Sequence, residues 1–336
     1  MDLDQRRARR EERKREQARR RARGLAAVAV LVAIGAIVAV VIASGGRSSK
    51  PGSSSTATSG TRSSATHGGA SAAATPASGA AQADKIVTPA QASHRVPGGV
   101  SVPILMYHVI NPPPAGAKFP GLYVSKVEFA EQMQALANAG YRAVTMDEML
   151  ANWTHGAKLP QGKPIVVSFD NGYQSQLTNA VPVLRKLGWV GVENIQLTGL
   201  PPSQGGLSRA QVAELVADGW ELDTQGISHA DLIALSPSAL HEQVVVARGE
   251  LQRRYHVPVN WFCYPSGHYN AAVIAELKAA GYVGSTTVVP GWASPTQDSY
   301  RLPRLRVLGG TSGAELASEI AAIRSSPDPP ASYSGA

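Results

Sequence analysis

The feature that most constrains the fold is a regular alternation of short apolar segments and helix-like segments after Val102. Such an alternation predicts an α/β fold with a parallel sheet. The number of units favours a distorted βα barrel over a two-unit fragment. In this architecture, chemistry belongs at the carboxyl ends of the strands. The predicted strands are Val102–His108, Tyr141–Thr145, Ile165–Phe169, Val190–Leu197, Trp220–Thr224, Val259–Cys263 and Val283–Thr287.

Helix starts are marked by Ser or Thr followed three residues later by Glu or Gln. This spacing is that of a capping box, in which side chain and backbone satisfy each other's hydrogen bonds. It occurs at Ser125 with Glu128, at Thr145 with Glu148 and at Ser208 with Gln211. The predicted helices are Ser125–Asn138, a short one after Thr145, Leu177–Leu187, Ser208–Gly219, Ser236–Tyr255, Asn270–Ala280 and Ser312–Arg324.

The N-terminal part has a different character. Residues 1–24 hold eleven Lys or Arg and five Asp or Glu, which accounts for +6 of the formal net charge of +8. The rest of the chain is nearly neutral, so a nucleic-acid partner is not expected. The apolar run Leu25–Ala43 has the length of a transmembrane helix. The basic tail before it predicts a cytoplasmic N-terminus and an extracytoplasmic C-terminal domain.

This apolar run has an alternative interpretation as a cleaved signal peptide, since Val41-Ile42-Ala43 resembles a cleavage site. The run exceeds the usual signal-peptide core of ~7–15 residues, which favours an uncleaved single-pass anchor in the cell membrane. Residues 44–99 are rich in Ser, Thr, Ala, Gly and Pro and predict a disordered stalk. The folded domain is expected over residues 100–325, followed by a flexible tail over 326–336. Cys263 is the only cysteine, so no intramolecular disulfide forms.

Polar residues follow three of the predicted strands. Asp170-Asn171-Gly172 comes after Ile165–Phe169, and Gln225-Gly226-Ile227-Ser228-His229 comes after Trp220–Thr224. Tyr264-Pro265-Ser266-Gly267 comes after Val259–Cys263. These side chains are the candidates for a functional site.

The order and spacing of these motifs resemble the polysaccharide deacetylase family, also called the NodB-homology family or carbohydrate esterase family 4. The opening Pro103-Ile104-Leu105-Met106-Tyr107-His108 resembles the branch that acts on poly-N-acetylglucosamine. The likeness covers about Val102 to Val307. It implies a NodB-like barrel, a hydrolase of carbohydrate metabolism, and a divalent metal, usually zinc, that activates water for attack on an N-acetyl group.

Carried over one residue at a time, the resemblance makes Asp170 the catalytic base. Asn171 stands where a metal-binding Asp is expected, and Gln225 where the first metal-binding His is expected. His229 matches the second His of the motif. Two of the three implied ligands are therefore carboxamides, which are weak zinc ligands. Asp170 as a cap of the following loop, and His229 as a structural His, are simpler interpretations of the same residues.

A substitute metal ligand is also conceivable. If the strand continues, Asp223 shares a face with Gln225, and it then reaches a metal together with Asp170 and His229. His108, at the end of the first strand, is expected to point into the same cleft. Tyr264, Pro265, Ser266 and Gly267 are expected to line that cleft, with Ser266 at a position that is aromatic in the family branch.

Two functions remain open from the sequence. The first is hydrolysis of N-acetyl groups, which are carbon–nitrogen but not peptide bonds, on a cell-surface polysaccharide, with a divalent zinc-like metal. The second is a catalytically inactive deacetylase fold, without a cofactor, that binds glycan or an envelope partner. The carboxamides Asn171 and Gln225 favour the second. The order of motifs favours the family in both cases.

Overall fold

The computed structural model describes residues 99–335, except 199 and 201–204. The basic tail, the apolar run Leu25–Ala43 and the stalk up to residue 98 lie outside the described residues. Within the described part of the chain, every helix is too short or too polar to span a bilayer.

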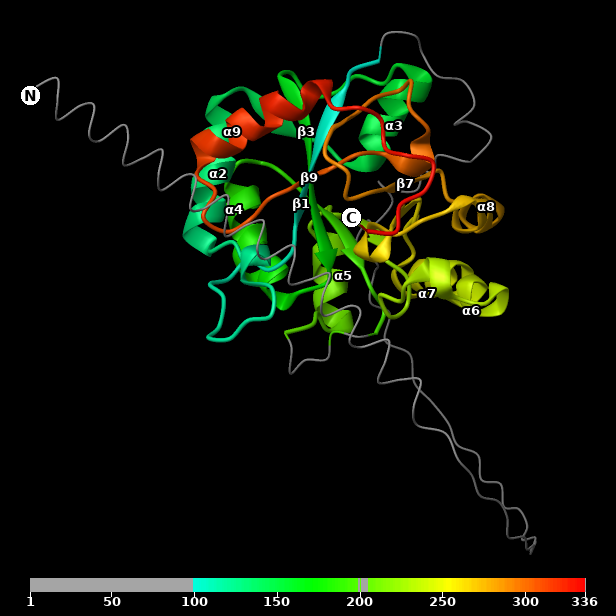
Figure 1. The fold of residues 1–336 in the computed structure, drawn as a ribbon. Helices are drawn as coiled ribbons and strands as arrows, with labels where there is room; N and C mark the ends of the chain where they lie inside the picture. The colour runs from blue at the N-terminus through cyan, green and yellow to red at the C-terminus, as the bar shows by residue number, and fades with distance from the viewer. Residues whose placement is uncertain (1–98, 199, 201–204, 336) are drawn as a thin grey trace, which may run out of the picture. The chain divides into compact units, whose positions relative to one another are not determined.

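The described chain alternates strands and helices, as the sequence predicts (Figure 1). The strands are β1 (Val102–Tyr107), β2 (Tyr141–Ala143), β3 (Lys163–Asn171), β4 (Val192–Ile195), β5 (Glu221–Thr224), β6 (Trp261–Cys263), β7 (Gly284–Thr286), β8 (Trp292–Ala293) and β9 (Leu305–Arg306). The α-helices are α2 (Lys126–Asn138), α3 (Met146–His155), α4 (Val181–Lys186), α5 (Arg209–Ala217), α6 (Pro237–His241), α7 (Ala247–Tyr255), α8 (Ala271–Ala279) and α9 (Gly313–Ala322).

The three predicted capping boxes form, and a further one at Ser312 and Glu315 opens α9. Two helices predicted as continuous contain a π-helical turn. The first begins with the π-helical turn Gln176–Ala180 before α4, and the second has Glu242–Val246 between α6 and α7. Hydrophobic periodicity does not register such a local change in the backbone hydrogen bonds.

The sheet has the order β7-β6-β5-β4-β3-β1-β8, with β2 beside β3 and β9 beside β1. All of these pairs are parallel except that of β1 and β8. The segment from Leu302 to Arg306 closes the ring, because Leu302 exchanges backbone hydrogen bonds with the end of β7 while Leu305 pairs with β1. The result is the distorted βα barrel that the alternation predicts.

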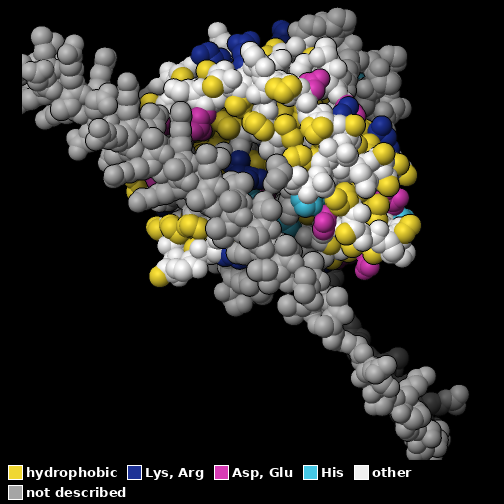
Figure 2. Space-filling model, in the orientation of Figure 1, with side chains coloured by type: hydrophobic (Ala, Val, Ile, Leu, Met, Phe, Trp, Pro, Cys, Tyr) yellow, Lys and Arg dark blue, Asp and Glu magenta, His cyan; other side chains and the backbone are white. Residues whose placement is uncertain are grey.

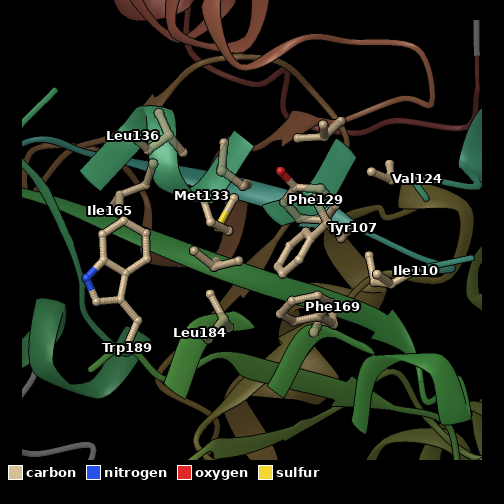
Figure 3. Packing of buried hydrophobic residues seen from close by; sticks show 14 of the residues in the cluster. Tyr107, Ile110, Val124, Phe129, Met133, Leu136, Ile165, Phe169, Leu184 and Trp189 are labelled. Atoms are coloured by element: carbon tan, nitrogen blue, oxygen red, sulfur yellow. The ribbon is translucent and has the colours of Figure 1, made fainter. Parts of the chain in front are cut away.

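Apolar side chains separate into a layer inside the barrel and two layers outside it. In one outer layer, Tyr107 and Phe169 of the sheet pack against Phe129 of α2, with an edge-on Tyr107–Phe129 contact of 5.1 Å between ring centroids (Figure 3). The other outer layer lies under α5 to α8. The inner layer includes Val166, Trp261 and side chains of α3. Alternate strand residues therefore face inward, and these carry the polar groups of the carboxyl end.

The chain after Ser325, expected as a flexible tail, is hydrogen bonded to the barrel. Tyr269 and Tyr333 exchange two backbone hydrogen bonds, and the Tyr269 hydroxyl donates to the carbonyl of Pro330 at 2.7 Å. Composition alone did not reveal this docking, because only Tyr333 and Pro329 of this short segment pack against the barrel and the remaining contacts are hydrogen bonds.

Candidate functional site

The carboxyl ends of β3, β4 and β5 place several polar side chains in one region. Strand register puts Asp170 beside Asn194, and Asn194 beside Asp223. On the face shown in Figure 2 the surface is hollowed, with Lys or Arg side chains in the hollow and histidine at its margin. We use "barrel mouth" for the side chains of His108, Asp170, Asn171, Gln225 and His229.

Asp170 is buried and fully engaged. Its two oxygens accept from the two Nη groups of Arg304 at 2.8 and 2.9 Å, and Oδ1 also accepts from Asn194 Nδ2 at 2.9 Å. The thiol of Cys263 lies 3.5 Å from Oδ2. Burial alone would raise the pKa of Asp170, but the Arg304 guanidinium outweighs it and holds the pKa at about 2. Asp170 is thus an ionised carboxylate with little tendency to accept a proton.

Arg304 was not identified as a site residue from the sequence. It is 0% exposed and also donates to the carbonyl of Thr287 and to Ser168. The sequence Arg301-Leu302-Pro303-Arg304-Leu305-Arg306 fits a closing strand. One available signal was the alternation of Arg304 with apolar neighbours, which turns it to the inner face of that strand.

Asn171 occupies a left-handed turn with a φ of 79°, a conformation that Asn tolerates better than most residues. Its backbone N–H donates to Gln225 Oε1 at 3.1 Å, and its Nδ2 donates to Gln196 Oε1 at 3.1 Å. Gly172 follows with a φ of 86°. The two carboxamides at the implied ligand positions therefore do come together, and Gln196, which the sequence analysis did not single out, joins them.

The histidines of the barrel mouth are both buried enough to disfavour their charged forms. Burial lowers the pKa of His108 to about 4, although Asp170 opposes this. Burial also lowers the pKa of His229, again against the influence of Asp170. The Nδ1 of His108 is buried, and no partner for it is seen among the described residues.

Asp223 lies on the inner face but is not brought to His229. Its Oδ1 accepts from the backbone N–H of Trp261 at 3.0 Å, and its carboxyl group is within hydrogen-bonding reach of Glu221. Burial raises the pKa of Asp223 to about 7. In the described part of the chain, no three His, Cys, Asp or Glu side chains form a metal-binding group. The expected set of Asp170, His229 and Asp223 is therefore not assembled.

Comparison with known proteins shows which family has this arrangement of motifs. A profile of the family described as "Polysaccharide deacetylase" matches residues 157–285. A Bacillus subtilis protein, YxkH, whose name places it among the polysaccharide deacetylases, is 30% identical over 224 residues, 66% of this chain and 77% of the relative. The chain belongs to the polysaccharide deacetylase family.

Other relatives of this family member are more distant. The poly-β-1,6-N-acetyl-D-glucosamine N-deacetylase of Escherichia coli K12 is 25% identical over 264 residues, 66% of this chain and 38% of the relative. A solved Streptococcus pyogenes deacetylase, PplD in complex with acetate, has a TM-score of 0.61 at 25% identity and covers 66% of this chain and 99% of its own. The barrel and the order of its motifs are therefore those of the family.

Within this polysaccharide deacetylase barrel, most residues of the segment Tyr264-Pro265-Ser266-Gly267 are buried and support the fold. Tyr264 stacks on Tyr269 with 4.8 Å between ring centroids, and its hydroxyl donates to the carbonyl of Tyr300 at 2.9 Å. Burial raises the pKa of Tyr264 well above its usual value. Gly267 has a φ of 78°, and a Cβ there would lie 2.4 Å from Val288. Pro265 is also buried, so Ser266 is the exposed member of the four residues expected in the cleft.

The residues at the ligand positions do not fit the divalent metal that the family implies. Asn171 and Gln225 are neutral, and zinc prefers imidazole, thiolate and carboxylate ligands. The Oε1 of Gln225 already accepts from the Asn171 backbone, and Asn171 Nδ2 is turned toward Gln196. Of the three implied metal-ligand positions, only His229 carries a side chain of the expected type. This deacetylase-family site is organised by the hydrogen bonds of three carboxamides, one between Asn171 and Gln196 and one from the Asn171 backbone to Gln225.

Proposed function

We propose that this family member binds an N-acetylated cell-surface polysaccharide at the barrel mouth without metal-dependent hydrolysis. The observation that carries the proposal is that both carboxamides at the positions of metal ligands are held by hydrogen bonds: Gln225 Oε1 accepts from the Asn171 backbone N–H, and Asn171 Nδ2 donates to Gln196 Oε1. Carboxamides offer both donors and acceptors, the groups that sugar hydroxyls and acetamides require. The names of the relatives support an N-acetylated glycan as the ligand class.

The state of Asp170 supports the same conclusion. A general base must be free to take a proton and works best with a pKa near the operating pH. Both Asp170 oxygens accept from Arg304, and the pKa of Asp170 is about 2 because Arg304 outweighs the effect of burial. Asp170 therefore serves mainly to neutralise Arg304 and to fix the shape of the mouth.

A second candidate function is the hydrolysis of N-acetyl groups, as in the family. The observation in its favour is that Asp170, at the position of the base, stays ionised and lies near His229 and His108. This function requires a bound divalent metal or another means of activating water.

Acetate release separates the two candidates. N-acetylglucosamine oligomers are incubated with zinc and the full chain, its Asp170→Asn variant, or the Asn171→Asp/Gln225→His double variant. We expect oligomer binding without acetate release by the original chain, and release by the double variant. Acetate release by the original chain that is lost in Asp170→Asn would overturn the proposal. Each variant is first checked for cooperative unfolding, since Asp170→Asn removes the partner of Arg304.

We also propose that the barrel lies outside the cell, attached to the membrane by a single helix over Leu25–Ala43. The support is the apolar length of this run and the basic tail that precedes it. Protease added to intact cells should digest the barrel and spare the basic tail. A barrel that is protected in intact cells would contradict this topology, and the N-terminal sequence of the mature chain would reveal signal cleavage.

A further inference from the structure

A cavity of about 280 Å³ adjoins the barrel mouth between the ends of β3 and β4 and the helices α5 and α7. Asn171 and Gln196 line it from the strand ends, and Arg209, Val212 and Tyr255 line it from the helices. Sites for small molecules have volumes of roughly 300–1,000 Å³. The cavity therefore suits one sugar unit better than a longer oligomer.

Asn171 and Gln196 offer one hydrogen-bond acceptor and one donor next to each other at this cavity. Asn171 Nδ2 donates to Gln196 Oε1, which leaves Asn171 Oδ1 as an acceptor and Gln196 Nε2 as a donor with no partner seen among the described residues. Asn171 and Gln196 are only 9% and 7% exposed. A secondary amide presents one N–H and one C=O, which are complementary to this acceptor and this donor.

The rest of the lining fits the remainder of an N-acetylated sugar. Ile195, Leu207 and Val212 provide an apolar wall for an acetamido methyl group. Arg209, which has no acidic partner in the described part of the chain, and the Tyr255 hydroxyl can donate to sugar hydroxyls. Glu250 also lines the cavity, and its carboxylate is committed to ion pairs with Arg253 and Arg254. The cavity thus contains no carboxylate that is free to favour a cationic amino sugar.

We propose that this cavity is a subsite for one N-acetylhexosamine unit, with its acetamido group bonded to Asn171 Oδ1 and Gln196 Nε2. The proposal rests on the proposed function, because it assigns part of the same glycan to a second location. It makes the cavity, rather than the barrel mouth alone, the source of preference for N-acetylated over de-N-acetylated chains.

The test compares affinities of the full chain for N-acetylglucosamine oligomers and for the same oligomers after de-N-acetylation. Val212→Phe fills the cavity, and Gln196→Leu removes the donor with little change in size. Gln196→Leu should weaken binding of the acetylated oligomer by about tenfold, the effect of one unmade buried hydrogen bond, and Val212→Phe by at least as much because it excludes the sugar unit. Neither should affect binding of the de-N-acetylated oligomer. Val216→Phe, one turn further along α5 and outside the cavity lining, is the matched control.

Saturation-transfer NMR on the original chain gives an answer that does not depend on how the variants fold. We expect strong transfer from protein methyl groups to the acetamido methyl of one sugar unit. Binding by a folded Val212→Phe variant that equals the original, or absence of this transfer, would overturn the subsite and leave the proposed function standing. Failure of the original chain to bind any N-acetylated oligomer would overturn both.

Discussion

Asp170 on β3 is buried beside Arg304, whereas Asp223 on β5 is buried beside Glu221, a second carboxyl group that is itself partly buried. The Arg304 guanidinium outweighs burial and keeps the pKa of Asp170 at about 2. Burial, with Asp147 as a further carboxylate nearby, raises the pKa of Glu221, and burial raises that of Asp223 to about 7. The pKa of a carboxyl group inside the barrel is therefore shifted in opposite directions in the two regions, and the presence of a cationic partner decides the direction.

The largest expected effect comes from removing that partner. Arg304→Met leaves Asp170 buried without its cation, and loss of one member of a buried ion pair typically costs about 3–5 kcal/mol. We expect the free energy of unfolding in urea at pH 7 to fall by this amount. The Asp170→Asn/Arg304→Met double variant should recover much of the loss. A loss below about 1 kcal/mol in the single variant would show that Arg304 is not what distinguishes the two regions.

The second effect concerns His108 at the barrel mouth. Burial is the main reason that its pKa is about 4, below the ~6.5 of an unfolded His. The unfolded chain therefore takes up this proton first, so stability is present above pH ~6.5 and is lost as the pH falls toward 4. Between pH ~6.5 and 4 this effect lowers the free energy of unfolding by about 3 kcal/mol, and His108→Gln should abolish this decrease. The measurement is the free energy of unfolding as a function of pH. The exposed His155→Gln is the control and should leave the slope unchanged.

The smallest effect concerns Glu221 and Asp223, whose contribution to stability changes with pH in the opposite direction to that of His108. The pKa values of Glu221 and Asp223 are raised by burial, so their stabilising contribution is present at low pH and is lost as the pH rises from ~4 to ~7. Glu221→Gln keeps the acceptor for the Asp147 N–H and a donor toward Asp223. We expect it to stabilise the fold by about 1–2 kcal/mol at pH 8 and hardly at all at pH 4. The exposed Glu214→Gln is the matched control, and equal effects of both variants would refute the comparison.

The residues around Asp170 could largely be predicted from the sequence, because they follow strands that are recognisable from their own apolar residues. Asp170, Asn171 and Gln225 lie at strand ends as expected, and the capping boxes fixed the starts of α2, α3 and α5. What could not be predicted depends on contacts between distant segments.

Asp223 shows what could not be predicted in the second region. Alternation correctly put its side chain on the inner face, but alternation does not tell which groups of the neighbouring strands it will meet. Its Oδ1 accepts from the Trp261 N–H, and its carboxyl group lies beside Glu221 rather than His229. Arg304 was missed for a related reason, since a strand pattern does not tell which inward residue will meet a charge.

The closing segment from Leu302 to Arg306 has a consequence for how the chain is made. Asp170 and Arg304 are 134 residues apart, so during synthesis the carboxylate exists long before its cation leaves the ribosome. Until then the edge of β7 is unpaired and that of β1 is covered only by the two residues of β8, and such edges are sites of aggregation in incomplete chains. The same segment provides both the closing strand and the charge that neutralises Asp170. A polypeptide that terminates early lacks both, which makes the completeness of the chain a condition for a sealed barrel.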